Sequence, residues 1–485
     1  MEPLVLTLIL LASAVARLWF LAAGVPHAVG IDEPQVVDRA LRILRTGSWN
    51  THLFDYPTLV IYLHASVQIV RFLWGALHGE WASLDAFSIE KIYLACRAVT
   101  AVIGVATVWL TWRLARDLAS RGVALLAAAE LAVRSLHVRE SHYALTDVPL
   151  TALTTLALWL AVRAARLRTT AGYAWAGAAC GLAAAAKYNG GVAMVAVAAA
   201  WFVADRTAAD RWRKAAAGLA AAAAAFLVAA PYTLLDLPSF LDGFAAQFSR
   251  FAGAPPGGAL WLTYVKHLSP AWSRWWVPLA IAGAAMVLAR PSTRRAWAPV
   301  VAFAAVFFYV LASHAPAFGR YALPLLPPLC ILTASAAAAI ASALAGIRGL
   351  GRPVARHVIT VAGIVLLVAL PAVETVAWLD ALKRPDTRTM AADWLKGSVP
   401  HASRIAVENS GPTYLDAAGF RVIASERLLD HPIAWYRDHA DLLVISASDL
   451  DRYESYVNAG PTVFQVEPTP QRWGPPIRVV EIRKE

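Results

Sequence analysis

The sequence predicts a polytopic α-helical membrane protein that carries a small α/β domain after its membrane region. Of its 485 residues, 59% are hydrophobic and only 15% are charged. Apolar runs close to the roughly 20 residues that cross a bilayer recur along the chain. After Trp378 the composition turns polar for the remainder of the sequence. We therefore expect a membrane region at residues 1–378 and an extracytoplasmic domain at residues 379–485.

The apolar runs define about eleven candidate transmembrane helices. No basic residue precedes the first run and no convincing small-residue cleavage site follows it, so we interpret it as an uncleaved anchor. Many of the later runs are rich in alanine, which lets helices pack closely in lipid. The predicted spans are Leu4–Ala22, Ile92–Trp112, Val123–His137, Val148–Val162, Ala171–Ala186, Gly190–Ala204, Ala215–Ala230, Ala271–Ala289, Trp297–Ala312, Tyr321–Leu344 and Val358–Trp378.

Positive charge is concentrated in short connections between these runs. The formal net charge is +11, but its distribution follows the positive-inside rule and argues against nucleic-acid binding. When the spans are counted in order, all of these connections fall on one side, which we predict to be the cytoplasm. They contain Arg113, Arg116 and Arg121; Arg163, Arg166 and Arg168; Arg206, Arg211, Arg213 and Lys214; Arg290, Arg294 and Arg295; and Arg348, Arg352 and Arg356.

The apolar run Leu59–Leu77 complicates this topology because it contains His64, Gln68 and Arg71. If it spans the membrane and the N-terminus starts inside, every later basic connection lies outside. Either the run lies along the outer surface as an interfacial helix, or the N-terminus is outside and the loop around Asp32 is cytoplasmic. We favour the interfacial helix, which makes residues 24–90 the first outer loop.

Two further regions have a distinct composition. Residues 231–270 contain prolines, glycines and aromatic residues and are expected to form a second outer loop. In the polar C-terminal region we predict a helix at Thr387–Lys396 and strands at Arg404–Glu408, Leu442–Ser446 and Ile477–Arg483. The three cysteines, Cys96, Cys180 and Cys330, lie in apolar runs, so we interpret them as small apolar core residues.

Two adjacent carboxylates, Asp32 and Glu33, follow the first span. In a structural interpretation, Asp32 caps a helix that begins at Glu33-Pro34, and Gln35 completes a capping box. In a catalytic interpretation, one carboxylate accepts a proton from an acceptor hydroxyl while the other orients it or binds a cation. The residues themselves leave both interpretations open.

A second polar loop lies between the third and fourth predicted spans. Asp147 with the preceding Thr146 is a good helix start, which is the structural interpretation. However, Arg139, Glu140 and His142 precede it, and such a density of polar groups at a membrane face is typical of an aqueous cavity. Within the third span, Glu130 and the nearby Arg134 are one helical turn apart and are expected to form a structural pair.

Basic side chains occur in two later outer turns. Lys187, followed by Tyr188, lies between two alanine-rich spans, where it either snorkels to the surface or holds a lipid phosphate. Arg320 lies beside Tyr321 and near His314, and a guanidinium can bind a phosphate through two parallel hydrogen bonds.

Taken together, these motifs resemble those of a GT-C glycosyltransferase, most similar to glycosyltransferase family 39 and its bacterial relatives, the protein O-mannosyltransferase and aminoarabinose-transferase group. Each match is short, but together they cover most of the membrane region in order. The matching segments are Ile31-Asp32-Glu33, Asp55-Tyr56-Pro57-Thr58-Leu59, His142-Tyr143-Ala144-Leu145-Thr146-Asp147-Val148-Pro149, Ala186-Lys187-Tyr188-Asn189-Gly190 and Gly319-Arg320-Tyr321-Ala322-Leu323-Pro324.

The resemblance implies transfer of a sugar from a polyprenyl-phosphate donor to a hydroxyl acceptor at the outer face of the plasma (inner) membrane. In this interpretation Asp32 matches the family's base or metal-linked acid, Glu33 its neighbour, and Asp147 the acid of the second loop. The expected donor-phosphate ligands are Lys187, Arg320, Tyr321 and Arg139, and the other pocket residues are Glu140, His142, Tyr188 and His314. Whether a divalent cation binds is left open; if one does, its expected ligands are Asp32 and Asp147. The chain lacks the large central domain of eukaryotic protein mannosyltransferases, so the acceptor is left open as well.

Two other functional classes are compatible with a polytopic chain. A lipid or sugar transporter or flippase would place its polar groups near the bilayer midplane and often show repeated halves. Here the polar groups gather at one face, apart from Glu130 and Arg134, and no repeat is visible. A different outer-face enzyme, such as an O-antigen ligase or polymerase, is the third alternative. Cleavage of a lipid-linked sugar by the purified protein separates an enzyme from a transporter.

Overall fold

A computed structural model describes residues 1–205, 207–252, 260–269, 273–314, 316–344, 358, 361–447, 449–469 and 472–483. The chain divides into two compact units, each assembled from separate stretches of sequence. The first comprises Met1–Trp19, Val36–Arg71 and Cys96–Thr375, and the second comprises Phe20–Gln35, Phe72–Ala95 and Val376–Glu485. The second unit thus combines the polar C-terminal region with two stretches of the predicted first outer loop.

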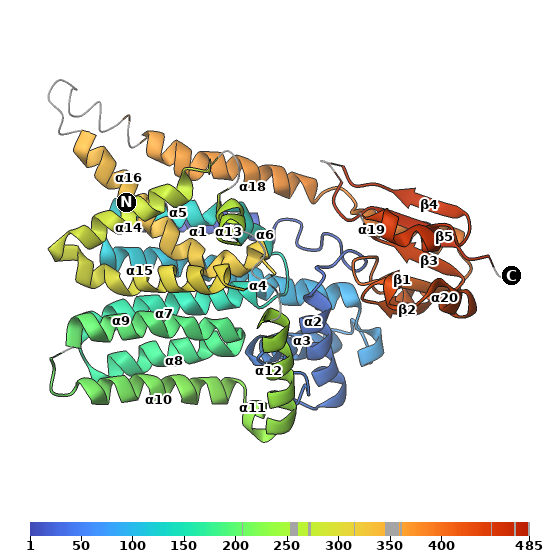
Figure 1. Ribbon diagram of the computed structural model, residues 1–485, viewed down its shortest axis with the longest axis horizontal. Helices are drawn as coiled ribbons and strands as arrows, with labels where there is room; N and C mark the ends of the chain where they lie inside the picture. The colour runs from blue at the N-terminus through green and yellow to red at the C-terminus, as the bar shows by residue number, and fades with distance from the viewer. Residues whose placement is uncertain are drawn as a thin grey trace. The chain divides into compact units, whose positions relative to one another are not determined.

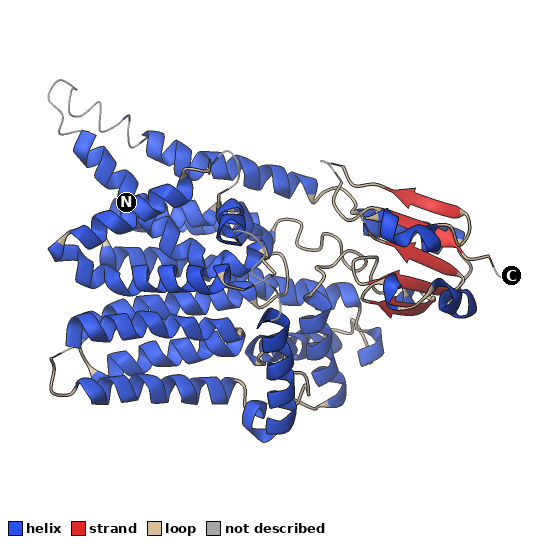
Figure 2. Ribbon diagram, in the orientation of Figure 1, coloured by secondary structure: helices blue, strands red, loops and turns tan. Residues whose placement is uncertain are grey.

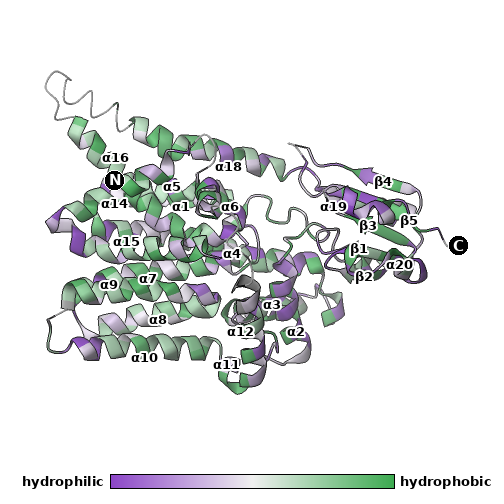
Figure 3. Ribbon diagram, viewed as in Figure 1, coloured by the Kyte–Doolittle hydropathy of each residue, from purple (hydrophilic) through white to green (hydrophobic). Residues whose placement is uncertain are grey.

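Seven helices among the described residues are long and apolar enough to cross a membrane, and most of their residues are hydrophobic in Figure 3. They are Leu59–Leu77, Ile89–Leu118, Asp147–Leu167, Arg211–Ala229, Pro291–Ala312, Gly319–Leu344 and Val361–Ala381, accompanied by the shorter apolar helices Tyr188–Ala204 and Trp276–Ala289. The prediction of a polytopic helical membrane protein is confirmed. The length and composition of Leu59–Leu77 would let it cross a membrane, so its interfacial placement stays a prediction.

The helices follow the predicted spans with shifted ends. The predicted span Val123–His137 is broken, because one helix ends at Ala132 and the next begins at Ser135. Other helices extend into basic residues, whose long side chains can reach from an apolar layer to water. The helices are α1 (Glu2–Leu18), α2 (Glu33–Thr46), α3 (Leu59–Leu77), α4 (Ile89–Leu118), α5 (Arg121–Ala132), α6 (Ser135–Glu140), α7 (Asp147–Leu167), α8 (Thr170–Ala186), α9 (Met194–Asp205), α10 (Arg211–Ala229), α11 (Tyr232–Leu235), α12 (Leu237–Ala252), α13 (Leu260–Leu268), α14 (Trp276–Ala289), α15 (Pro291–Ala312), α16 (Leu326–Leu344) and α18 (Leu370–Ala381).

Small residues bring the helices of the first unit into close contact. Helix α8 packs between α7 and α10, and the three run side by side in Figure 1. A Cβ atom added at Gly177 would lie 2.0 Å from the carbonyl oxygen of Gly218, and one at Gly181 would lie 2.1 Å from that of Ala222. The backbones of α8 and α10 therefore touch, which is the packing that glycine and alanine allow in lipid.

A buried polar network joins three helices of the same unit. Arg134 Nη2 lies 2.5 Å from Glu130 Oε1, and the guanidinium lies 3.8 Å from the centroid of the Trp276 ring. The Trp276 indole N–H donates to Glu130, and Thr333 Oγ1 donates to the other carboxylate oxygen at 2.8 Å. The predicted structural pair is confirmed, with partners on α14 and α16 that satisfy the buried carboxylate.

The second unit contains a five-stranded sheet with the strand order β2-β1-β3-β5-β4. Strand β1 pairs in parallel with β2 and β3, while β5 pairs antiparallel with β3 and β4. Separate apolar clusters cover the two faces of the sheet, and helices flank it in Figure 2. The strands are β1 (Arg404–Glu408), β2 (Arg421–Ser425), β3 (Leu442–Ile445), β4 (Thr462–Val466) and β5 (Ile477–Glu481), and the main helices are α19 (Thr387–Ser398) and α20 (Ile433–His439).

The structure confirms the predicted α/β fold of this C-terminal region. The predicted helix and all three predicted strands are present, and β1 has the predicted bounds. The prediction omitted β2 and β4, which are the two edge strands of the sheet.

Candidate active site

Asp147 is the first residue of α7 and lies at the centre of a charged cluster in the first unit. Pro149 occupies the first helical turn, where its missing N–H costs no helix hydrogen bond. Thr146 precedes the helix as predicted, but its side chain makes no capping hydrogen bond. The Asp147 side chain is only 3% exposed, so its carboxylate needs partners inside the protein.

Lys187 supplies the first of these partners. It follows the last residue of α8, and its Nζ lies 2.7 Å from Asp147 Oδ1. The same ammonium group lies 4.4 Å from the centroid of the Tyr321 ring. The turn after it requires Gly190, because a Cβ at that position would lie 2.2 Å from the carbonyl oxygen of Ala183. The structure thus directs the Lys187 ammonium to a buried carboxylate instead of to the surface.

Arg320 supplies the second partner from the 3-10 segment Gly319–Leu325. Its Nε lies 3.8 Å from Asp147 Oδ2, and its guanidinium lies 5.1 Å from the ring centroid of Phe318 and 5.6 Å from that of Tyr321. Two cations therefore face one carboxylate. The net positive charge of these three groups favours the binding of a further anion beside them.

The preceding loop belongs to the same electrostatic environment. Arg139 donates to Glu140 Oε1 through Nε and Nη2, at 3.0 and 2.9 Å. Burial raises the pKa of Glu140; Arg139 and Arg320 oppose this shift, and Asp147 adds to it. Helix α6, which ends at Glu140, packs against the segment Gly319–Leu325, so the polar loop and the Arg320 segment lie close together.

A cavity of about 370 Å³ lies beside Lys187 and Tyr321. This volume lies within the range of small-molecule sites, and most of the other lining residues are aromatic or apolar, as such sites usually are. The cavity suits an amphipathic ligand that places an anionic group near Lys187. Its lining residues are Asp55, Tyr56, Lys187, Tyr188, Asn189, Phe244, Gln247, Tyr264, Val310, Leu311, His314, Pro316 and Tyr321.

Asp55, an acidic residue of the cavity wall, is held by an arginine of α2. Arg39 Nη1 lies 2.6 Å from Asp55 Oδ1 and Nη2 lies 3.1 Å from Oδ2. This is the bidentate geometry in which Arg–carboxylate pairs are most specific. The arginine therefore fixes the orientation of the Asp55 carboxylate.

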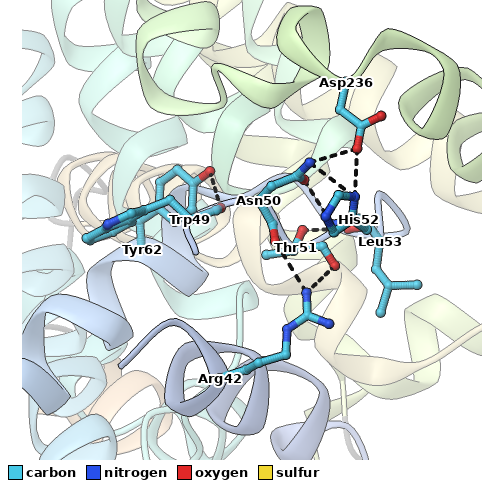
Figure 4. Close-up of polar contacts among 8 residues, drawn as sticks. All are labelled: Arg42, Trp49, Asn50, Thr51, His52, Leu53, Tyr62 and Asp236. Carbon is cyan, nitrogen blue, oxygen red and sulfur yellow. Dashed lines mark hydrogen bonds and ion pairs between the residues drawn. The ribbon is translucent and has the colours of Figure 1, made fainter. Parts of the chain in front are cut away.

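The loop before Asp55 is fastened to the second outer loop, as Figure 4 shows. Asn50 Nδ2 and His52 Nδ1 lie 2.8 and 2.9 Å from the same oxygen, Asp236 Oδ2. On the other side of the loop, Arg42 Nη2 donates to the carbonyl oxygen of Thr51 at 2.6 Å. The segment that leads to the cavity wall is thereby anchored at both sides.

Asp32 and Glu33 belong to the second unit, where their environments differ. Helix α2 begins at Glu33 as predicted. Glu33 is fully buried, and its Oε2 accepts a hydrogen bond from the Gly30 N–H at 2.7 Å. Asp32 is only partly buried. Of the two carboxylates, Glu33 closes the loop that precedes the helix, while Asp32 retains exposed surface.

The remaining predicted pocket residues divide into two groups. Tyr188 and His314 line the cavity, and the Tyr188 hydroxyl donates to the carbonyl oxygen of Phe54 at 2.8 Å. His142 is buried between two carbonyl oxygens, with Nδ1 2.9 Å from that of Val138 and Nε2 3.0 Å from that of Trp19. Burial lowers the pKa of His142 to about 4, and the two carbonyl contacts oppose this shift. His142 thus contacts the backbone of two segments and is not a lining residue of the cavity.

Several cavity residues were not predicted as site residues. Asp55 and Tyr56 belong to a motif that supported the resemblance, while Phe244, Gln247 and Tyr264 come from the aromatic-rich second outer loop. The composition of that loop was the available signal. Among the residues described by the structure, no group of three or more His, Cys, Asp or Glu side chains could hold a metal ion.

Comparison with known proteins bears on the family and the fold of the chain. Residues 86–234 match the family described as dolichyl-phosphate-mannose-protein mannosyltransferase. No curated protein matched the chain.

Two solved structures cover nearly all of the chain. The archaeal oligosaccharyltransferase AglB from Archaeoglobus fulgidus, in complex with an inhibitory peptide and a dolichol-phosphate, has a TM-score of 0.61 and 14% identity, covering 92% of this chain and 69% of its own. ArnT from Cupriavidus metallidurans, bound to undecaprenyl phosphate, has a TM-score of 0.60 and 14% identity, covering 98% of this chain and 97% of its own. These matches confirm the predicted GT-C fold. The family match confirms the predicted resemblance and, with it, the predicted class of membrane glycosyltransferase.

Proposed function

We propose that this membrane glycosyltransferase transfers a sugar from a polyprenyl-phosphate donor to a hydroxyl acceptor at the extracytoplasmic end of its helical bundle. The main support is the cavity beside Lys187, where a buried Asp147 faces both Lys187 and Arg320. The similar structures named above contain a dolichol-phosphate and an undecaprenyl phosphate, and both are lipids with an anionic head and an apolar body.

The distribution of charge supports the proposed sidedness. Helix α7 has Asp147 at its first turn and Arg166 in its last turn, and its 21 residues separate the two ends by about 30 Å. Helix α15 likewise begins after Arg290 and ends two residues before His314 of the cavity wall. The cavity therefore lies at the end of the bundle opposite these basic connections. Because basic loops favour the cytoplasm, the cavity end is assigned to the extracytoplasmic side.

In this proposal the donor phosphate binds at the net positive cluster. Lys187 offers an ammonium beside the cavity, and Arg320 offers a guanidinium that can bind two oxygens. Asp147 keeps both cations in place, so its proposed role is to orient Lys187 and Arg320 and not to accept a proton. Tyr321 packs under the Lys187 ammonium, and Arg139, with its side chain 41% exposed, adds positive charge nearby.

Sugar transfer then needs a base and a departing group. Asp32 is proposed to accept the proton of the acceptor hydroxyl, whose oxygen forms a bond to the anomeric carbon as the bond from that carbon to the phosphate oxygen breaks. The electron pair of the broken bond leaves with the polyprenyl phosphate, whose negative charge Lys187 and Arg320 stabilise. A single displacement of this kind inverts the configuration at the anomeric carbon. Glu33 contributes by shaping the loop that carries Asp32.

The test is consumption of the donor by the purified protein in lipid nanodiscs. A panel of radiolabelled undecaprenyl-phosphate monosaccharides is incubated with the protein and a mixture of hydroxyl acceptors, and released undecaprenyl phosphate is measured. Asp32→Asn should reduce release by about 10²–10⁴-fold, the usual contribution of a general base. The control is Asp85→Asn, which removes an exposed carboxylate of the same unit and should leave release unchanged. Full activity of the Asp32 variant would refute its role as the base.

A further inference from the structure

The loop that carries Asp32 is hydrogen-bonded to the C-terminal α/β domain within the second unit. After β1, the Thr413 N–H donates to the carbonyl oxygen of His27 at 3.0 Å, and Thr413 Oγ1 donates to that of Pro26 at 2.6 Å. In return, His27 Nδ1 lies 2.7 Å from the carbonyl oxygen of Thr413. These three contacts of Thr413 fix this part of the loop to the segment that follows β1.

Arg388 of α19 makes a second attachment closer to Asp32. Its Nη1 donates to the carbonyl oxygen of Val29 at 2.8 Å. Its Nε and Nη2 lie 2.9 and 3.0 Å from the two carboxylate oxygens of Asp386. Asp386 also caps α19 through the Arg388 N–H, and both side chains are only 14% exposed. Asp386, the N-cap residue of α19, therefore orients the guanidinium that contacts the loop.

These attachments leave little freedom around Asp32. Arg388 holds Val29 three residues before Asp32, and Glu33, the residue after it, holds the Gly30 N–H. A general base must be held within about 0.5 Å of its productive position to be effective. The residues that hold its loop therefore bear on the rate of the chemical step.

We propose that the C-terminal α/β domain positions Asp32 for catalysis, and that Arg388 and Thr413 are the positioning residues that hold its loop. We call these two residues the latch. This inference rests on the proposed function, in which Asp32 is the base. It gives the α/β domain a role in catalysis itself, beyond any contact with the acceptor.

Hydrogen–deuterium exchange of the full-length protein in nanodiscs tests the latch without requiring activity. In Arg388→Gln, and separately in Thr413→Val, backbone exchange of residues 26–33 should become about tenfold faster, as expected for loss of a hydrogen bond that involves a charged or buried group. Exchange in α7 and α8 should stay unchanged. If exchange of residues 26–33 does not change in either variant, the latch is refuted.

Two matched controls separate the latch from general damage to the domain. Arg404 has the same bonding pattern as Arg388, since it pairs with the Asp441 carboxylate and donates to the carbonyl oxygen of Asp438, so Arg404→Gln removes equivalent contacts away from the loop. Thr389 is the control for Thr413, because its Oγ1 has no hydrogen-bond partner among the described residues. Neither Arg404→Gln nor Thr389→Val should change exchange at residues 26–33.

The kinetic effect then tests positioning. With the donor that the wild-type protein consumes, both latch variants should lose at least about tenfold in kcat while the donor KM changes little, because the donor cavity is in the first unit. Faster exchange with unchanged kcat would refute the positioning role. An active Asp32→Asn variant, or a wild-type protein that consumes no donor, would refute the proposed function, while the exchange data would still decide whether the latch exists.

Discussion

Replacement of Lys187 by methionine tests the proposed donor-phosphate site. The substitution keeps a long side chain but removes the ammonium that lies 2.7 Å from Asp147 Oδ1. A charge-assisted hydrogen bond contributes about 1.5–3 kcal/mol, so undecaprenyl phosphate should bind about 10–150-fold more weakly. Binding of the lipid to purified protein in nanodiscs, titrated at fixed salt concentration, measures this change directly.

The same substitution should also destabilise the protein. Removing one partner of a buried ion pair usually costs about 3–5 kcal/mol because the other charge is left uncompensated. Arg320 remains 3.8 Å from the second Asp147 oxygen, so we expect a smaller loss of about 2–3 kcal/mol. A lower thermal unfolding temperature, with the fold retained at the temperature of the binding assay, would allow the two effects to be measured separately.

Lys214 provides the matched control for Lys187. Its Nζ lies 2.9 Å from Asp210 Oδ1 and its side chain is 4% exposed, but it lies at the first turn of α10 and is not a lining residue of the cavity. Lys214→Met should leave lipid binding unchanged. The interpretation of the cavity would be refuted if Lys187→Met bound undecaprenyl phosphate as tightly as wild type, or if both variants lost affinity equally.

Two further predictions concern the supports of the site. Gly190→Ala should lower thermal stability and weaken lipid binding, because its Cβ would lie 2.2 Å from the Ala183 carbonyl oxygen, whereas Gly191→Ala, whose Cβ would meet nothing closer than 3.9 Å, should behave as wild type. Since burial lowers the pKa of His142 from 6.5 to about 4, the unfolded chain binds a proton over this range that the folded protein does not. Stability should therefore fall as pH decreases from 6.5 towards 4, by up to about 3 kcal/mol. Thermal unfolding at several pH values should show less of this loss in His142→Gln than in the exposed-site control His314→Gln; equal pH dependence in both variants would contradict the assignment.

The apolar runs predicted the membrane helices because burial in lipid requires nearly continuous hydrophobic sequence. Short apolar stretches between polar residues identified β1, β3 and β5, which lie inside the sheet. This criterion failed for β2 and β4, which are the edge strands of the sheet and consist mostly of exposed and partly buried residues. Residues 422–424 of β2 are as apolar as residues 405–407 of β1, so hydrophobicity alone does not distinguish the edge strand from the inner one.

For the candidate site, the sequence indicated the residue types but not their partners. The sequence analysis selected Asp147, Lys187 and Arg320 from three separate outer turns. Lys187 lies 40 positions after Asp147 in the chain and Arg320 lies 173 positions after it, so both ion pairs depend on how α7, α8 and the Arg320 segment pack. At the start of α2, the Glu33 side chain reaches back to accept a hydrogen bond from the Gly30 N–H, a contact that the sequence did not indicate. Two aromatic residues of the cavity wall, Phe244 and Tyr264, come from a loop whose aromatic composition the sequence shows but whose position it does not indicate.

The proposed function requires the chain to cleave the bond between a sugar and a polyprenyl phosphate. The most direct measurement uses the donor labelled with ³H in the sugar and ³²P in the phosphate, added to sealed proteoliposomes that contain the purified protein and a hydroxyl acceptor. We predict that the two labels separate, with ³H appearing in the acceptor product and ³²P in free polyprenyl phosphate. If both labels cross the membrane together in intact donor, the protein is a transporter and the proposed function is wrong.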